Sequence, residues 1–153
     1  MPAGYGLGPE GEGLLAWGDV EQRLSAARNY WVATTRPDGR PHVMPVWGLW
    51  IDGAFHFSTD PRSRKGMNLA ANPNAVVHLE SGDDVVVVEG TVAPVMDGDF
   101  LGRFVEAYDA KYGFRPDPAD PGGAFYRLHA RVALAWREQD FPTSASRWLF
   151  AGS

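Results

Sequence analysis

The chain has 153 residues, of which 44% are hydrophobic and 22% charged, so it is globular in composition, and a disordered or fibrous protein is excluded. We expect one domain over residues 1–153, with the Gly-rich residues 1–13 as a mobile N-terminal segment. The formal net charge of −5 argues against nucleic acid as a partner. Neither a signal peptide nor an apolar run of about 20 residues is present, so we expect a cytoplasmic protein without a membrane partner.

The first half of the chain predicts a helix and then strands. The helix is expected to begin at a capping box formed by Asp19 and Gln22. Three consecutive antiparallel strands are expected next, at 30–35, 42–51 and 55–57, with turns at 37–39 and at Asp52-Gly53. Both faces of the run 42–51 are apolar, which predicts a strand covered on both sides.

The second half predicts further strands and two helices. Expected helices lie at 64–71, before Asn72-Pro73, and from Asp97 or Asp99 to Gly113. The second helix repeats an aromatic residue every four positions, which we interpret as core packing; these residues are Phe100, Phe104, Tyr108 and Tyr112. Further strands are expected at 75–80, 85–91, 125–136 and 147–150. The pattern indicates a mainly β (α+β) protein, a small barrel of six or seven antiparallel strands with two or three covering helices.

A basic turn between the third strand and the following helix is the main candidate site. Residues 58–65 contain three hydroxyl side chains and three cations, namely Ser58, Thr59, Arg62, Ser63, Arg64 and Lys65. The turn leads into a helix N-terminus, where free N–H groups and the helix dipole favour an anion. These residue types suit a phosphate monoester. The alternative is a solvated basic turn in which Ser63 is only a helix cap.

Large aromatic side chains lie in the strands close to this turn. Trp31, Trp47 and Trp50 stand in the first two strands, and Phe55 and Phe57 follow in the third. An aromatic cleft beside an anion site suggests a planar heterocycle with a phosphate tail, whereas the alternative is a Trp-rich core or dimer interface. The chain has no Cys, and its four His are not spaced as metal pairs, so no metal site is expected.

Several short segments together resemble the flavin- and deazaflavin-binding split β-barrel superfamily, the pyridoxamine 5′-phosphate oxidase-like proteins. The matching segments are Tyr30 to Thr35, Asp38 to Val43, Pro45-Val46-Trp47, Asp52-Gly53, Ser58-Thr59, Ser63-Arg64-Lys65, Asn68-Leu69, Asn72-Pro73 and Val86 to Gly90. The resemblance is dense over residues 19–95 and weaker in the C-terminal third. It implies a split β-barrel, and a homodimer with a cofactor in a cleft at the interface.

The resemblance also implies which residues bind the cofactor. Ser58, Thr59, Arg62, Ser63, Arg64 and Lys65 fall on or beside the segment that binds the cofactor phosphate. Met44, Pro45, Val46 and Trp47 fall on the strand that runs beside the cofactor ring. No side chain stands out as a proton donor, so the catalytic residues are unknown.

Two departures from the oxidase pattern favour coenzyme F420 as the cofactor. A flavin-contacting glutamine of the oxidase falls here near Val85, and the segment Phe141 to Trp148 is more similar to the deazaflavin-dependent branch. An F420-dependent oxidoreductase that transfers a hydride to a small conjugated or cyclic substrate is therefore expected. The alternatives are an FMN-dependent oxidase or reductase and a non-catalytic protein that binds flavin, F420 or heme.

Overall fold

The computed structural model describes residues 15–150 of the chain, so the expected N-terminal segment 1–13 lies outside the described residues. This part contains eight strands and four α-helices. The strands are β1 (Tyr30–Thr35), β2 (Pro41–Val46), β3 (Gly48–Ile51), β4 (Ala54–Thr59), β5 (Asn74–His78), β6 (Asp84–Pro94), β7 (Ala124–Arg137) and β8 (Ser146–Leu149). The α-helices are α1 (Trp17–Ala26), α2 (Arg64–Ala71), α3 (Gly98–Tyr112) and α4 (Phe141–Ser144).

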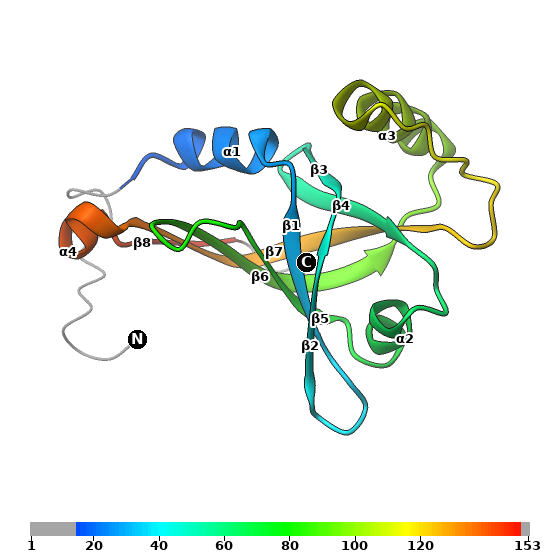
Figure 1. Ribbon diagram of the computed structural model, residues 1–153, viewed down its shortest axis with the longest axis horizontal. Coiled ribbons are helices and arrows are strands. Elements are labelled where there is room, and N and C mark those ends of the chain that lie inside the picture. The colour runs from blue at the N-terminus through cyan, green and yellow to red at the C-terminus, as the bar shows by residue number, and fades with distance from the viewer. Residues whose placement is uncertain (1–14, 151–153) are drawn as a thin grey trace.

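All eight strands form one curled antiparallel sheet, and the predicted mainly β class is confirmed (Figure 1). The order along the sheet is β2-β1-β5-β6-β7-β4-β3, and β8 pairs with the second half of β7. The strand expected over 42–51 is wrong as a single element, because the chain breaks at Trp47 into β2 and β3. The expected pairings β1–β2 and β3–β4 are present, but β2 and β3 lie at opposite ends of the sheet order, so the two hairpins are not joined through one shared strand. This break gives eight strands where six or seven were expected.

The Asp52-Gly53 hairpin is confirmed. Asp52 (φ 54°) and Gly53 (φ 72°) both adopt left-handed backbone conformations between β3 and β4. A two-residue turn of this kind matches the twist of an antiparallel pair and fixes its register, with Ile51 opposite Ala54. Turn chemistry therefore sets which side chains of β4 face inward.

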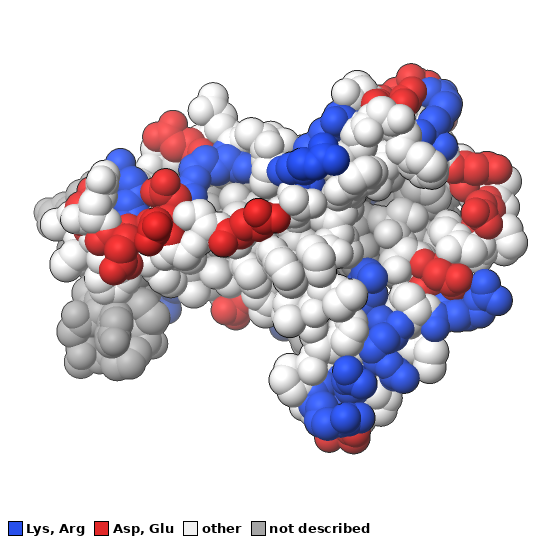
Figure 2. Space-filling view, in the orientation of Figure 1, with Lys and Arg blue, Asp and Glu red and all other residues white. Residues whose placement is uncertain are grey.

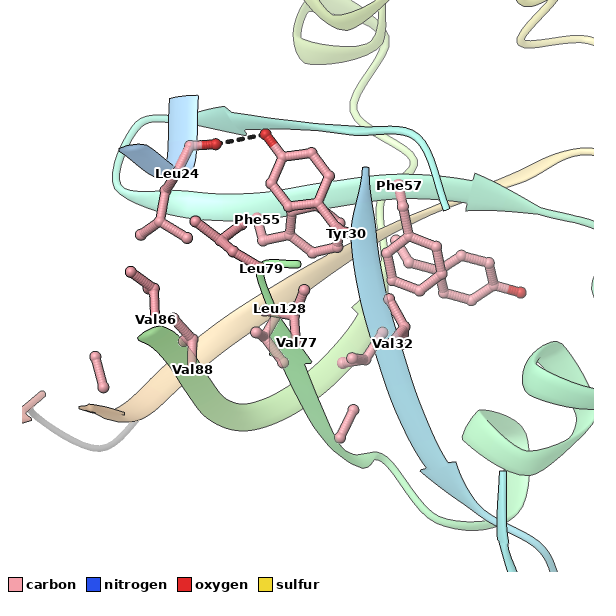
Figure 3. Close-up of a cluster of buried hydrophobic side chains, with 14 of the residues drawn as sticks. Leu24, Tyr30, Val32, Phe55, Phe57, Val77, Leu79, Val86, Val88 and Leu128 are labelled. Atoms are coloured by element: carbon pink, nitrogen blue, oxygen red, sulfur yellow. Dashed lines mark hydrogen bonds between the residues drawn. The ribbon is translucent and has the colours of Figure 1, made fainter. Parts of the chain in front are cut away.

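The core lies on the concave face of the sheet (Figure 3). Strands β1, β4, β5, β6 and β7 contribute buried residues to it, including Tyr30, Val32, Phe55, Phe57, Val77, Val88 and Leu128. Leu24 of α1 packs against the same cluster, and the Tyr30 hydroxyl donates to its carbonyl oxygen. Each fully buried aliphatic or aromatic side chain of this kind contributes about 1.5–3 kcal/mol.

Helix α1 begins earlier than the sequence pattern predicts. Its N-cap is Ala16, which makes no side-chain capping bond, so the capping box of Asp19 and Gln22 is wrong. Trp17 at the first turn lies 6.2 Å from Trp50 and 5.1 Å from Trp148 between ring centroids. Aromatic packing against the sheet therefore decides where this helix starts.

Two other expectations about packing are also corrected. Strand β2 is exposed in this chain and not covered on both sides; Val43 and Met44 are 48% and 47% exposed. On α3, Phe100 and Phe104 are buried as expected, but Tyr108 and Tyr112 are only half-buried and lie beside Trp47. No helix of the described residues is long and apolar enough to cross a membrane.

Candidate functional site

A group of basic side chains gathers where the β1–β2 hairpin meets the start of α2. We call it the basic corner and define it as Arg36, His42, Ser63, Arg64 and Lys65. Figure 2 shows Lys and Arg side chains concentrated over this end of the molecule. Burial lowers the pKa of His42, and the nearby charges of Arg36, Lys65 and Arg64 lower it further. The fold thus adds residues of the hairpin to the predicted basic turn.

The start of α2 is held in a tight turn by Ser63. The Ser63 hydroxyl accepts a hydrogen bond from the Gly66 N–H (3.1 Å) and lies 3.0 Å from the Thr59 hydroxyl. Gly66 has no room for a side chain, because a Cβ there would lie 2.6 Å from the carbonyl oxygen of Asp60. Within residues 15–150, the backbone N–H groups of Arg64 and Lys65 donate to no other group. They remain available to an anion.

Three buried polar atoms around this corner lack partners in the described part of the chain. They are Arg36 Nε, His42 Nδ1 and Asn68 Oδ1. The Asn68 side chain is fully buried and donates to the Thr34 hydroxyl at 3.0 Å. Unpaired buried polar atoms are costly, so their presence near several cations makes this corner a candidate binding site.

Lys65 and Arg62 differ in how free their charges are. Lys65 is half-buried, and burial lowers the pKa of its ammonium group. Arg62 instead pairs with Asp60 at 3.1 Å, and its side chain is 83% exposed. Of the predicted cations, Arg64 and Lys65 are therefore better placed to bind an anion than Arg62.

A cleft of about 370 Å³ lies at the other end of β2. Its lining includes the predicted residues Pro45, Val46, Trp47 and Ser58. Asn29 and Tyr108, which the sequence reasoning missed, complete the lining. The change from Phe to Tyr along the aromatic repeat of α3 was the one signal that could have marked Tyr108.

Strand β2 connects the cleft with the basic corner. His42 lies near its start and Trp47 directly follows its end, about 16 Å apart along an extended strand. Met44 lies between them and is exposed. Strand β4 also links the two places, since Ser58 lines the cleft and the adjacent Thr59 contacts Ser63. An elongated ligand with an anion at one end and a flat ring at the other matches this arrangement.

Helix α3, whose Tyr108 lines the cleft, is joined to the sheet by a group of polar and aromatic contacts. We call this group the α3 contact; its residues are Gly48, His56, Phe100, Lys111, Tyr112 and Arg127. Lys111 donates to the Tyr30 hydroxyl (2.9 Å) and the Gly48 carbonyl (3.1 Å), and burial lowers its pKa to about 8. The Tyr112 hydroxyl accepts from the Gly48 N–H at 3.0 Å and reaches the Arg28 carbonyl at 2.8 Å.

A buried histidine lies in the same contact. His56 is 1% exposed, accepts a hydrogen bond from Arg127 Nε at 2.8 Å and packs on Phe100. Burial, together with the Arg127 charge, lowers the pKa of His56 to about 4. The ring is therefore neutral at pH 7 and accepts through Nε2. Arg127 is hydrogen-bonded to His56 and is not among the residues that line the cleft.

Comparison with known proteins gives a consistent family. The family model described as "Pyridoxamine 5'-phosphate oxidase" matches residues 17–137. A pyridoxine/pyridoxamine 5'-phosphate oxidase of Sphingopyxis alaskensis is 34% identical over 126 residues, which cover 76% of this chain and 57% of the relative. The chain thus spans little more than half of that relative.

Solved structures share the fold. The conserved hypothetical protein Rv2991 of Mycobacterium tuberculosis has a TM-score of 0.71 and 26% identity, with 82% of this chain and 86% of that chain covered. A structure described as an F420 reductase has a TM-score of 0.58 and 24% identity, with 82% of this chain and 98% of that chain covered. At that identity, the second likeness concerns the fold alone.

Proposed function

Because the chain belongs to the pyridoxamine 5'-phosphate oxidase family of split barrels, we propose that it is an oxidoreductase that binds a phosphorylated flavin-type cofactor along β2. The observation that carries the proposal is the basic corner, where unpaired donors, two free backbone N–H groups and the cations Arg64 and Lys65 meet. The donor set fits a phosphate group, since ammonium, guanidinium and helix N–H groups all favour its charge.

Eight of the ten predicted binding residues have a part in this proposal, all except Ser58 and Arg62. Arg64 and Lys65 hold the phosphate, and the hydroxyls of Ser63 and Thr59 add hydrogen bonds. Met44, Pro45, Val46 and Trp47 lie beside the ring. β2 ends the described sheet, so one of its backbone edges has no strand partner there and can hydrogen-bond ring carbonyl groups. When bound, the cofactor supplies hydride transfer to a small conjugated or cyclic substrate.

We favour F420 over FMN for two reasons in the sequence. Val85 stands where the oxidase has its flavin-contacting glutamine, and residues 141–148 are more similar to the deazaflavin-dependent branch. FMN is the second candidate, because it is the cofactor that a resemblance to the oxidase implies, and the Sphingopyxis alaskensis relative carries the oxidase name.

A side-by-side fluorescence titration of the protein with F420 and with FMN tests this proposal. We expect F420 to bind at least tenfold more tightly, a difference of about 1.4 kcal/mol. Equal or tighter binding of FMN would move the protein to the flavin branch. If neither cofactor binds at micromolar concentration, the proposed function is wrong. A bound cofactor whose reduced form passes its electrons to no acceptor would make the protein a carrier.

We also propose that the protein works as a homodimer, because nine of the twelve residues in two cross-strand rows on the convex face of its sheet are apolar. Two cross-strand rows run over this face: Val43, Ala33, Val76, Glu89, Val132 and Leu149 in one, and Pro45, Trp31, His78, Val87, Leu134 and Arg147 in the other. Val43 and Leu149, at the ends of the first row, are 48% and 71% exposed. An exposed sheet face that is mostly apolar is typical of an interface.

Analytical ultracentrifugation at micromolar concentration tests the dimer. A species of twice 16.7 kDa is the expected result. A single 16.7 kDa species across that range would rule the dimer out.

A further inference from the structure

The cleft at Trp47 contains a flat apolar surface and a hydroxyl group. Trp47, 37% exposed, follows β2, and Tyr108 reaches the cleft from α3. Their ring centroids lie 6.4 Å apart at an interplanar angle of 52°. A cleft of about 370 Å³ is within the range of pockets that hold small organic molecules.

Trp47 lines the cleft and has a tyrosine stacked on one face of its ring. Tyr112 stacks on Trp47 at 4.6 Å with an interplanar angle of 7°. The other two groups near Trp47 are Tyr108 and Arg28, which lie 4.8 Å and 5.8 Å from the Tyr112 ring. A group stacked on the far face of Trp47 would lie roughly 9 Å from Tyr112. Both groups therefore lie on the Tyr112 side or at the edge, so no aromatic or cationic group of residues 15–150 stacks on the far face, where a flat ligand could stack from the cleft.

The hydroxyl groups of Tyr30, Tyr108 and Tyr112 differ in their partners. Tyr30 donates to the Leu24 carbonyl and receives a bond from Lys111. Tyr112 is bonded to Gly48 and Arg28. Over residues 15–150, the Tyr108 hydroxyl has no hydrogen-bond partner. Burial raises the pKa of Tyr108, with a further contribution from Tyr112, so the hydroxyl stays protonated at neutral pH.

We propose that Tyr108 determines substrate specificity: its hydroxyl donates a hydrogen bond to a carbonyl or nitro oxygen of a flat conjugated substrate that stacks on the far face of Trp47. The inference rests on the proposed function, because the cofactor ring is assigned to the same end of β2. A site that hydrogen-bonds its substrate discriminates against an analogue without the acceptor, since the donor is then left unpaired.

Two ligands of the same ring shape test this role. Menadione has a fused ring with two carbonyl oxygens, and 2-methylnaphthalene has the ring alone. The chain has no cysteine, so menadione has no thiol to react with. Ligand-observed NMR titrations would be run on wild type, Tyr108→Phe and Tyr112→Phe, each without cofactor and with oxidised F420 or FMN. Without an electron donor, these titrations measure binding and no turnover.

We expect wild type to bind menadione more tightly than 2-methylnaphthalene. Tyr108→Phe should raise the Kd of menadione about three- to tenfold, which is the effect of one hydrogen bond. The Kd of 2-methylnaphthalene should change by less than about twofold. Tyr112→Phe, one turn along the same helix, should leave the ratio of the two affinities unchanged. The Kd of the cofactor should be the same in Tyr108→Phe as in wild type.

Two results would overturn the assignment. If Tyr108→Phe changes the Kd of both ligands equally, or of neither, the Tyr108 hydroxyl does not select an acceptor group. If Tyr108→Phe weakens cofactor binding, the hydroxyl serves the cofactor ring. Failure of the proposed function shows separately, as wild type that binds neither cofactor; the comparison without cofactor then still decides the role of Tyr108.

Discussion

The basic corner and the α3 contact both place polar groups in partly buried positions, but they satisfy them differently. In the α3 contact, Lys111 and Tyr112 each have at least two hydrogen-bond partners within the chain. In the basic corner, Arg36 Nε and His42 Nδ1 are buried without partners among the described residues. Only His56 Nδ1 is similarly unpaired in the α3 contact. The difference is the one expected between a structural polar network in the α3 contact and the proposed anion site in the basic corner.

The largest expected effect concerns pH and the α3 contact. The pKa of His56 is lowered from 6.5 to about 4, so the unfolded chain takes up a proton more readily than the folded protein between these values. Stability should therefore fall as the pH drops from 6.5 to 4, by about 3 kcal/mol from this residue. His56→Gln keeps an acceptor near Arg127 but does not titrate. Urea unfolding at pH 7 and pH 4 should show a smaller loss for this variant, and an identical loss would contradict the prediction.

The next effect concerns cofactor binding at the basic corner. Arg64→Ala and Lys65→Ala should each raise the Kd of the cofactor about tenfold or more, because each removes a charge-assisted hydrogen bond worth roughly 1.5–3 kcal/mol. Arg103→Ala is the matched control, since Arg103 pairs with Asp52 at 3.1 Å on the β3–β4 turn. Fluorescence titration measures the three variants.

A cofactor analogue without the phosphate sharpens this test. Its affinity should be nearly insensitive to Arg64→Ala and Lys65→Ala. If the intact cofactor binds all variants as tightly as wild type, the basic corner is only a solvated surface.

A smaller effect is expected when one hydroxyl of the α3 contact is removed. Tyr112→Phe leaves the buried Gly48 N–H without its acceptor, which should lower the free energy of unfolding by about 1–2 kcal/mol. Tyr108→Phe loses no hydrogen bond of the described chain and should change it by less than about 0.5 kcal/mol. Urea unfolding of both variants checks the difference, and equal losses would show that Tyr112 has no special structural role.

The smallest signal is a change in the titration of His42. The charges of Arg36, Lys65 and Arg64 contribute to its lowered pKa, so an anion bound among them should raise it. NMR titration of the His42 ring with and without cofactor measures the shift. An unchanged pKa in the presence of saturating cofactor would place the phosphate elsewhere.

Local signals in the sequence predicted much of this molecule. The Asp52-Gly53 turn and the Ser63 cap depend on neighbours within a few residues, and both are confirmed. The break at Trp47 was missed, because the apolar residues on both faces of the run 42–51 favoured one continuous strand, although Pro45 and Gly48 stand on either side of the break. The start of α1 was missed because distant rings, Trp50 and Trp148, decide it.

The same distinction holds for the candidate site. Ser63, Arg64 and Lys65 are adjacent in sequence, so their grouping could be predicted. Asn29 reaches the cleft from the connection between α1 and β1, and Tyr108 reaches it from α3. No pattern within one segment of the sequence predicts that these two residues come together. The buried pairing of His56 with Arg127 likewise spans 71 positions in the chain.

Strand β7 has a consequence for the order in which the chain can fold. It pairs with β4, β6 and β8, and the β3–β4 hairpin has no other strand partner in the described sheet. During synthesis, the hairpin with its core residues Phe55 and Phe57 therefore cannot pair with the rest of the sheet until residues 124–128 have left the ribosome. Long-range pairing of this kind folds slowly and leaves apolar strands exposed to aggregation meanwhile. A chain truncated before β7 should be captured by chaperones, whereas one truncated after β8 should fold.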